Sequence, residues 1–367
     1  MLQPPLVGES PVEGPRRLLA YMEECRGRVV DEIREIVPRD ARAGGLLYEL
    51  MLDYPLRGGK ALRPALCIAT CRALGGHLES VLRSSAVLEL YHNAFLIHDD
   101  VEDGSDLRRN QRTLHRLHGV PIAVNVGDGM LALTMEPLLE NIELVGLGRA
   151  LRILRVVARM ARESAEGQMM ELDWVRRADW SPADRSYLRM VYKKTCWYTF
   201  IAPVLVGGIA AGARESELAD LARFVTPLGI AFQIQDDVLN LVGEASRYGK
   251  EIDGDLWEGK HTLLLIHAVR RASHEQRREA LRILSRPRPG EGLRAGPVAG
   301  GVKSEQDVAF LRELVLRGGG VDYARAVARR HADRARRSFE RIGAGLPGSV
   351  HRDFLESLVD FVVARDR

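Results

Sequence analysis

The sequence is poor in aromatic residues and carries almost no net charge. Aromatic side chains make up 6% of the 367 residues, whereas charged side chains make up 28%, a balance that favours helices over strands. Lysine and arginine total 53 against 50 aspartates and glutamates, for a net charge of +3. So small an excess gives no reason to expect nucleic-acid binding.

Cysteine is also scarce. Cys25, Cys67, Cys71 and Cys196 form no CxxC pair and no metal-binding spacing with histidine. Cys67 and Cys71 fall one helical turn apart, which suits reduced thiols in a core better than a disulfide framework. We therefore expect a cytoplasmic protein.

We expect a soluble protein without a membrane-spanning helix. The most apolar stretch, Phe200–Ala213, is interrupted by Pro203 and by glycines and is shorter than the ~20 residues that a spanning helix needs. Met1–Pro15 contains proline, glycine and glutamate without a long apolar run, so we expect a mobile tail and no signal peptide there. Residues 16–367 are expected to form one all-helical domain.

An acidic cluster ends the clearest helical pattern. Val87–Ile97 has the periodicity of a core helix and leads directly into His98–Asp103. Asp99 and Asp103 lie one turn apart on one helix face, and carboxylates so close resist ionising together unless cations lie between them. Oxygen ligands with this spacing suit Mg²⁺, which proteins bind through one or two carboxylates together with substrate phosphates.

Positive charge follows this acidic cluster. Gly104 is expected to end the helix, and Arg108 and Arg109 lie just beyond it. Arginine supplies fixed positive charge for a phosphate group. Acidic side chains that hold a metal, followed by arginines that hold phosphate, predict a diphosphate site.

A second acidic cluster has the same design. The helix expected over Ala219–Leu241 carries Gln233, Asp236, Asp237 and Asn240 on one face. One such aspartate pair could be a solvated helix end, but two pairs on separate apolar helices favour a shared metal site. Asparagine keeps an oxygen ligand but lacks a charge, so we expect Asp236 to carry most of the metal binding here.

With these motifs the sequence resembles the trans-isoprenyl diphosphate synthases, or polyprenyl synthetases, from about Arg57 to at least Thr262. The matching residues are Gly58, Gly59, Lys60, Ala61, Leu62, Arg63, Pro64, His92, residues 98–109, Lys194, Thr195, Gln233, residues 236–240, Lys250, Gly259 and Lys260. The resemblance implies an all-α isoprenoid synthase-type bundle around a central cavity, with the aspartate motifs facing each other across it. It also implies a homodimer.

The resemblance further implies a Mg²⁺-dependent condensation of isopentenyl diphosphate with an allylic diphosphate, without an organic cofactor. It implies metal binding by Asp99, Asp100, Asp103, Asp236, Asp237 and Asn240. It assigns isopentenyl diphosphate to Lys60, Arg63, His92 and Arg109. It assigns the allylic substrate and its departing diphosphate to Arg108, Lys194, Thr195, Gln233, Lys250 and Lys260.

Two acidic residues have open roles. Glu171 stands where the family commonly has aspartate, and Asp255 is a candidate for binding a metal through water. Two later stretches are expected to be simple surface. Ser285–Lys303 is rich in proline, glycine and arginine and predicts a surface loop, and the arginines between Arg325 and Arg337 favour a solvated helix face over a site for RNA or acidic lipid.

The residues before the first aspartate motif bear on product length. Ala94 and Phe95 lie five and four positions before Asp99, where members of the family often place the aromatic floor of the product cavity. Ala94 leaves room, whereas Phe95 is bulky enough to stop elongation if it points inward. One aromatic residue rather than two predicts geranylgeranyl diphosphate (C20), with farnesyl diphosphate (C15) second.

Two other functions remain open. A class I terpene cyclase has a metal motif that Asp236–Asn240 with Glu244 loosely matches, although a cyclase has no use for a second diphosphate site. A non-catalytic subunit of a heteromeric synthase is the other alternative. Such subunits tend to lose an aspartate motif, and both motifs are largely intact here.

Overall fold

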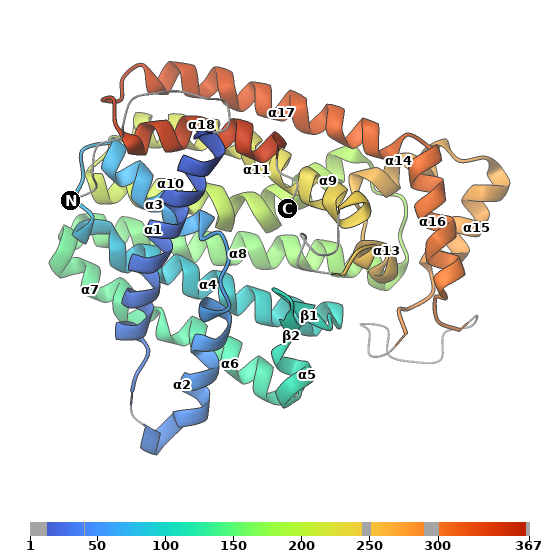
Figure 1. Ribbon diagram of the computed structural model, residues 1–367, viewed down its shortest axis with the longest axis horizontal. Helices are drawn as coiled ribbons and strands as arrows, with labels where there is room; N and C mark the ends of the chain where they lie inside the picture. Colours follow the sequence, from blue (N-terminus) through green and yellow to red (C-terminus); the bar gives the residue numbers. More distant parts are fainter. Residues whose placement is uncertain (1–12, 40, 244–250, 290–300, 365–367) are drawn as a thin grey trace.

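The computed structural model describes residues 13–39, 41–243, 251–289 and 301–364, and this part of the chain is almost entirely helical (Figure 1). Its one small sheet pairs β1 (Leu107–Arg108) with β2 (Gln111–Arg112) in antiparallel register. The helices before residue 180 are α1 (Glu13–Ile36), α2 (Ala41–Leu56), α3 (Leu62–Ala73), α4 (Glu79–Asp103), α5 (Leu114–His118), α6 (Val120–Leu133), α7 (Met135–Val145) and α8 (Leu147–Arg177).

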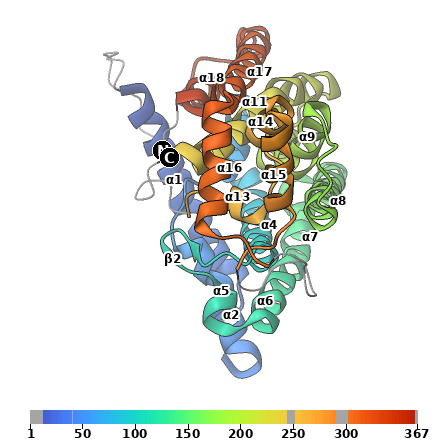
Figure 2. The same ribbon diagram turned by 90° about the vertical axis from the view of Figure 1, so that its right-hand side faces the viewer.

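The later helices complete the bundle and confirm the all-α fold class. They are α9 (Asp184–Val191), the π-helix η1 (Tyr192–Ile201), α10 (Ala202–Ala211), α11 (Glu215–Val242), α13 (Gly254–Glu258), α14 (Leu263–Arg271), α15 (His274–Leu284), α16 (Glu305–Arg317), α17 (Gly320–Gly343) and α18 (Val350–Ala364). Figure 2 shows α14, α15 and α16 gathered at one end of the molecule.

Helix ends follow from local chemistry. Gly104 ends α4 in the left-handed conformation with φ 63°, as expected from a residue without a Cβ. The Ser304 hydroxyl begins α16 by accepting a hydrogen bond from the Asp307 amide at 3.2 Å. The sequence pattern from Pro121 to Val145 predicts one helix with a kink at Pro137. Instead the stretch divides at Thr134 into α6 and α7, because proline has no amide hydrogen and its ring displaces the carbonyl four residues earlier.

The two helices that carry the aspartate motifs lie inside the bundle. α4 packs against α6, α7, α3 and α1, while α11 packs along α17 and also contacts η1 and α10. In Figure 1, α17 runs along the top of the molecule and α2, α5 and α6 lie at the bottom, with α4 and α8 between them. The motifs therefore sit on rigid, well-packed elements.

Two helical stretches are long and apolar enough to cross a membrane by length and composition alone. In residues 184–211, 78% of the most apolar window is buried inside the protein, which identifies this stretch as part of the core. In residues 120–145, only 39% of the most apolar window is buried, because α6 and α7 expose part of their apolar face. The stretch is divided into two helices at Thr134, where α6 ends and α7 begins.

Small residues allow α3 and α10 to pack closely. A Cβ added to Gly207 would lie 2.3 Å from the carbonyl oxygen of Cys67. All four cysteines are buried free thiols, as the sequence predicted for Cys67 and Cys71. The α3–α10 contact thus depends on the absence of a side chain at Gly207.

We expect Gly207→Ala to lower the free energy of unfolding by about 1–3 kcal/mol, because the new methyl group overpacks the α3–α10 contact. Chemical denaturation measures this change. The matched control is Gly148→Ala in the first turn of α8, where an added Cβ meets no atom within 4 Å. An equal effect of both substitutions would contradict the role assigned to the close contact.

Candidate active site

The two acidic motifs line one cavity of about 300 Å³, bordered by α4, α8, η1, α11 and α13. Among the residues predicted to form the site, those on the cavity wall are Phe95, Asp99, Asp103, Arg108, Lys194, Thr195, Gln233, Asp236, Asp237, Asn240 and Lys260. The wall does not include Lys60, Arg63, His92, Ala94, Asp100 or Arg109. Lys250 lies outside the residues that the structure describes.

Two lysines contact the inward carboxylates of the first motif. Lys260 Nζ lies 2.6 Å from Asp103 Oδ2, and Lys194 Nζ lies 3.5 Å from Asp99 Oδ1. Burial and the neighbouring carboxylate of Glu258 raise the pKa of Asp103 to about 7, although Lys260 opposes the shift. The ammonium groups thus compensate these carboxylates only in part, so added cations would stabilise the ionised cluster.

Asp100 points away from this cavity. Its carboxylate is 1% exposed and accepts hydrogen bonds from the Tyr54 hydroxyl at 2.7 Å and from Arg108 Nε at 2.9 Å. One residue along a helix is a rotation of about 100°, which directs Asp100 into the protein when Asp99 faces the cavity. This placement goes against the prediction that Asp100 binds metal. It serves instead to orient Arg108.

Neutral hydrogen-bond donors contact the carboxylate of Asp237 in the second motif. Asp237 accepts hydrogen bonds from the Tyr187 hydroxyl at 2.7 Å and from Gln233 Nε2 at 2.8 Å. Gln233 Oε1 in turn accepts a hydrogen bond from the Thr195 hydroxyl at 2.8 Å. Burial and repulsion by Asp255 raise the pKa of Asp237 well above its ordinary value. The three predicted residues Thr195, Gln233 and Asp237 therefore form one hydrogen-bonded chain across η1 and α11.

Asn240 connects the second motif to the segment that follows it. Its Oδ1 accepts a hydrogen bond from the Asp255 amide at 3.1 Å, and its Nδ2 donates to the Glu251 carbonyl at 3.4 Å. Asp255 and Glu251 both line the cavity. Asn240 consequently holds Glu251 and Asp255 beside α11, in addition to placing a side-chain oxygen at the cavity.

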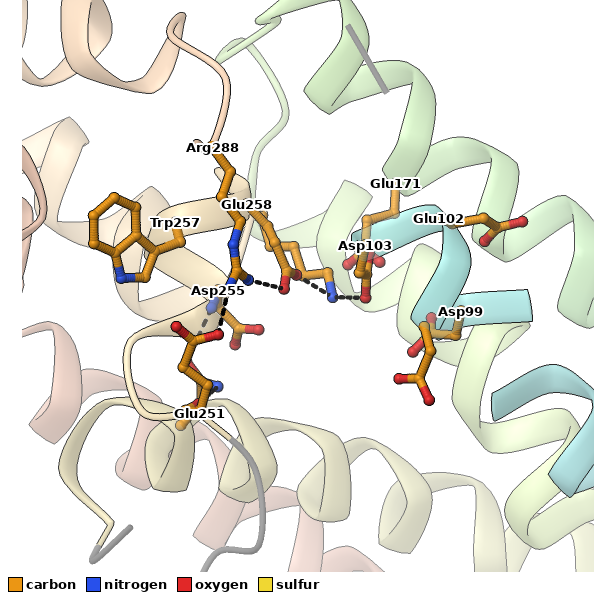
Figure 3. Close-up of polar contacts among 12 residues, drawn as sticks. Asp99, Glu102, Asp103, Glu171, Glu251, Asp255, Trp257, Glu258 and Arg288 are labelled. Atoms are coloured by element: carbon orange, nitrogen blue, oxygen red, sulfur yellow. Dashed lines mark hydrogen bonds and ion pairs between the residues drawn. The ribbon is translucent and has the colours of Figure 1, made fainter. Parts of the chain in front are cut away.

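Several residues of the site, among them Glu258 and Gln168, were not predicted. Glu258 on α13 lies 2.6 Å from Lys260 Nζ, and Gln168 on α8 donates to Glu102 at 2.5 Å. Figure 3 shows Asp99, Glu102 and Asp103 on α4 opposite Asp255 and Glu258. Glu171, whose role the sequence left open, pairs with Lys194. Although burial would raise its pKa, Lys194 and Lys260 hold the pKa of Glu171 below its ordinary value.

The π-helix η1 aims three side chains at the cavity: Lys194, Thr195 and Tyr198. π-helical segments are rare and occur mostly at functional sites. α8 approaches the η1 backbone so closely that a Cβ on Gly167 would lie 2.3 Å from the Lys194 amide nitrogen. Gly167 precedes Gln168, so this Gly-Gln pair is a sequence signal for the contact.

A second group of positive side chains lies on the other side of Tyr198. The Arg63 guanidinium stands 4.4 Å over the Tyr198 ring and donates to the Thr199 hydroxyl at 2.8 Å. Arg63 Nε is buried and has no hydrogen-bond partner among the described residues. The His92 ring also lies near Tyr198, with ring centroids 6.0 Å apart. A buried guanidinium with an unused donor is suited to a phosphate group.

Strained backbone surrounds this basic group. Gly59 has φ 128°, and a Cβ there would lie 2.9 Å from Arg109 Nη2. Ala61 and Arg109 also have positive φ values, 47° and 55°, and such strain concentrates at ligand sites. Burial and the nearby arginines lower the pKa of Arg109, although Glu89 opposes the shift. The Lys60 ammonium lies 5.5 Å from the ring of Phe361 on α18.

The apolar end of the cavity contains Phe95 and Leu96. The Phe95 ring packs edge-on against Tyr198, with centroids 5.7 Å apart, and against Tyr91 at 5.8 Å. Ala94 is fully buried away from the cavity wall. Of the two residues predicted to control product length, only Phe95 therefore borders the cavity.

The donor set fits a hard divalent cation. Asp99, Asp103 and Asp236 offer oxygen ligands from two helices to one cavity. Among the described residues, no three His, Cys, Asp or Glu side chains lie close enough to hold a metal on their own. Divalent cations such as Mg²⁺ commonly combine one or two carboxylates with substrate phosphates and water.

Asn240→Asp should keep most of the activity, because the carboxylate can still accept the Asp255 amide hydrogen bond. Asn240→Leu removes that acceptor and should raise the Mg²⁺ concentration needed for half-maximal activity. Titration of activity with Mg²⁺ measures the difference. If the two variants behave alike, the anchoring role assigned to Asn240 is wrong.

The comparisons with known proteins agree with this geometry. The family model described as polyprenyl synthetase matches residues 46–292. A short chain isoprenyl diphosphate synthase from Methanothermobacter thermautotrophicus is 31% identical over 95% of this chain and 98% of its own length. A geranylgeranyl pyrophosphate synthase from Geoglobus acetivorans is 30% identical over 95% of this chain and 100% of its own.

Solved structures give the same result for the fold. A polyprenyl synthase from Caulobacter crescentus CB15, complexed with calcium and isoprenyl diphosphate, superposes with a TM-score of 0.82 at 29% identity, over 99% of this chain and 100% of its own. The resemblance seen in the motifs thus extends over nearly the whole chain. The chain belongs to the polyprenyl synthetase family and is a trans-prenyltransferase.

Proposed function

We propose that this protein condenses isopentenyl diphosphate with an allylic diphosphate and releases geranylgeranyl diphosphate as its main product. One observation carries the proposal: Tyr198 borders the cavity that contains Lys194, Lys260 and Arg108, and its ring also contacts Arg63, which is not on the cavity wall. We assign one diphosphate to each of these two groups of positive side chains. A terpene cyclase has a single diphosphate substrate and would not need the site around Arg63. The intact aspartate motifs on the cavity wall also speak against a non-catalytic subunit.

The allylic substrate is assigned to the acidic cavity. Asp99, Asp103 and Asp236 would hold Mg²⁺ there, with Asn240 as a further oxygen donor. When bound, the metal supplies Lewis-acid stabilisation of the charge on the diphosphate. Lys194, Lys260 and Arg108 add positive charge on the same wall. Their fixed positive charges favour departure of the diphosphate, because they stabilise the negative charge that develops on it.

The reaction then needs little further protein chemistry. The C1–O bond of the allylic substrate breaks and its electron pair leaves with the diphosphate. The Thr195 and Gln233 oxygens lie near the resulting allylic cation, while Phe95, Leu96 and Met190 give its chain an apolar environment. The double bond of isopentenyl diphosphate attacks C1, and a proton passes to the released diphosphate as the new alkene forms.

Lys60→Ala and Arg63→Ala should each raise the KM for isopentenyl diphosphate by about 10- to 100-fold, because a charge-assisted contact contributes ~1.5–3 kcal/mol. The KM for the allylic substrate should change little. Steady-state kinetics with each substrate varied in turn measures both constants, and Arg223→Ala, which removes an exposed partner of Asp220, is the control. Equal weakening of both substrates, or cyclic hydrocarbon formed without isopentenyl diphosphate, would favour a cyclase.

Phe95→Ala should shift the product from C20 to longer chains, because the aromatic ring at the apolar end is removed. Chromatography of the products from isopentenyl diphosphate and each allylic primer measures the chain length. Phe310→Ala, which shortens a partly buried aromatic residue on α16, should leave the C20 product unchanged. An unchanged product in Phe95→Ala would mean that another residue limits elongation.

We further infer a cytoplasmic homodimer. More than half of the exposed large apolar side chains of the described chain lie between Val120 and Leu151, on α6, α7 and the start of α8. Patches of this kind mark interaction surfaces, and a second copy of the chain is the occupant that we assign.

One connected core joins buried side chains from α1 to α18, which supports a single domain from residue 16 onward.

A further inference from the structure

Glu258 lies between two cations that approach it from opposite sides. Its Oε2 is 2.6 Å from Lys260 Nζ on the cavity wall, and its Oε1 is 3.6 Å from Arg288 Nη1. The Glu258 side chain is 13% exposed. Arg288 is not on the wall of the main cavity. Figure 3 shows Arg288 on the side of Glu258 that faces away from Asp103.

Arg288 also joins neighbouring segments of the site. Its Nη2 lies 2.5 Å from Glu251, which follows α11, and 3.9 Å from Asp106, which follows α4. The Arg288 side chain is 13% exposed, whereas composition predicted a surface loop for this stretch. One largely covered guanidinium thus lies among carboxylates from three separate parts of the chain.

Contacts of Pro287 and Lys303 hold the segment that carries Arg288. The Lys303 amide donates to the Pro287 carbonyl at 2.9 Å, directly beside Arg288. The Lys303 side chain is buried, and its Nζ donates to the Trp257 carbonyl at 2.6 Å. These contacts attach residues 287–288 and 303 to α13, the short helix that ends at Glu258. Arg288 is therefore part of a built structure rather than a mobile surface side chain.

The consequence concerns Lys260. Its ammonium group is divided between Asp103 and Glu258, at 2.6 Å from each. A substrate diphosphate that recruits Lys260 must draw it away from these carboxylates. If Lys260 were the sole cation at Glu258, its departure would leave a buried carboxylate uncompensated, which is strongly unfavourable. With Arg288 at the other oxygen, Glu258 keeps a counter-charge.

We propose that Arg288 is a positioning residue for diphosphate binding: it holds Glu258 so that Lys260 can exchange Glu258 and Asp103 for the diphosphate of the allylic substrate. The proposal rests on the function assigned above to the acidic cavity. Arg288 makes no contact with substrate in this account. It acts through Glu258.

The test is calorimetric binding of inorganic pyrophosphate at saturating Mg²⁺. Arg288→Met should weaken binding about tenfold, equivalent to ~1.4 kcal/mol. Arg282→Met, which removes an exposed partner of Glu279 on α15, is the matched control and should bind as the unmodified protein does. Arg288→Lys retains the charge and should recover most of the affinity. This second variant still tests the proposal if Arg288→Met fails to fold.

A double-mutant cycle distinguishes positioning from a general loss of positive charge. In Glu258→Gln no buried carboxylate needs compensation, so adding Arg288→Met should then change pyrophosphate affinity less than about twofold. In kinetics, Arg288→Met should raise the KM for the allylic substrate but not for isopentenyl diphosphate. Normal affinity in Arg288→Met, or independent effects of the two substitutions, would overturn the proposal. Failure of the unmodified protein to bind pyrophosphate would instead refute the function assigned to the cavity.

Discussion

Repulsion among buried carboxylates is the constraint on which this structure depends. Carboxylates outnumber lysine and arginine side chains on the cavity wall, and two of them, Glu171 and Asp237, are buried. Burial of like charges is tolerated only when each has a partner. Lys194 and Lys260 partner the carboxylates of the first motif. Their contacts keep α4, α8, η1 and α13 facing one another around a space that cations and diphosphate can enter.

Both aspartate motifs separate their paired carboxylates in the same way. The second aspartate of each pair receives a hydrogen bond of 2.7 Å from a buried tyrosine hydroxyl, Tyr54 for Asp100 and Tyr187 for Asp237. The first aspartate of each pair lines the cavity, and of the two second aspartates only Asp237 does so. A tyrosine on a neighbouring helix thus fixes the rotation of each motif helix about its axis. This arrangement links the packing of α2 and α9 to the direction in which Asp99 and Asp236 point.

Sequence reasoning found the parts of the site that helical periodicity determines. Asp99, Asp103, Gln233 and Asp236 were predicted from spacing within single helices, and all of them line one cavity. Periodicity cannot indicate which distant side chains meet, so the partners Glu258 and Tyr187 were missed. Composition failed at Lys303, because a lysine in a glycine- and proline-rich stretch is normally exposed. Here a backbone carbonyl of α13 gives its ammonium a buried partner.

Because η1 is a π-helix, the site also depends on the number of residues in this segment, and not only on their side chains. Its hydrogen bonds span five residues where an α-helix spans four. Loss of one residue from Tyr192–Ile201 would let the segment close into an α-helix, because the wider π-helical turn accommodates the extra residue. The helix after it could then keep its orientation, so Gly207 would stay against the backbone of α3. The change would fall on the contacts of η1 itself, such as the hydrogen bond between Thr195 and Gln233.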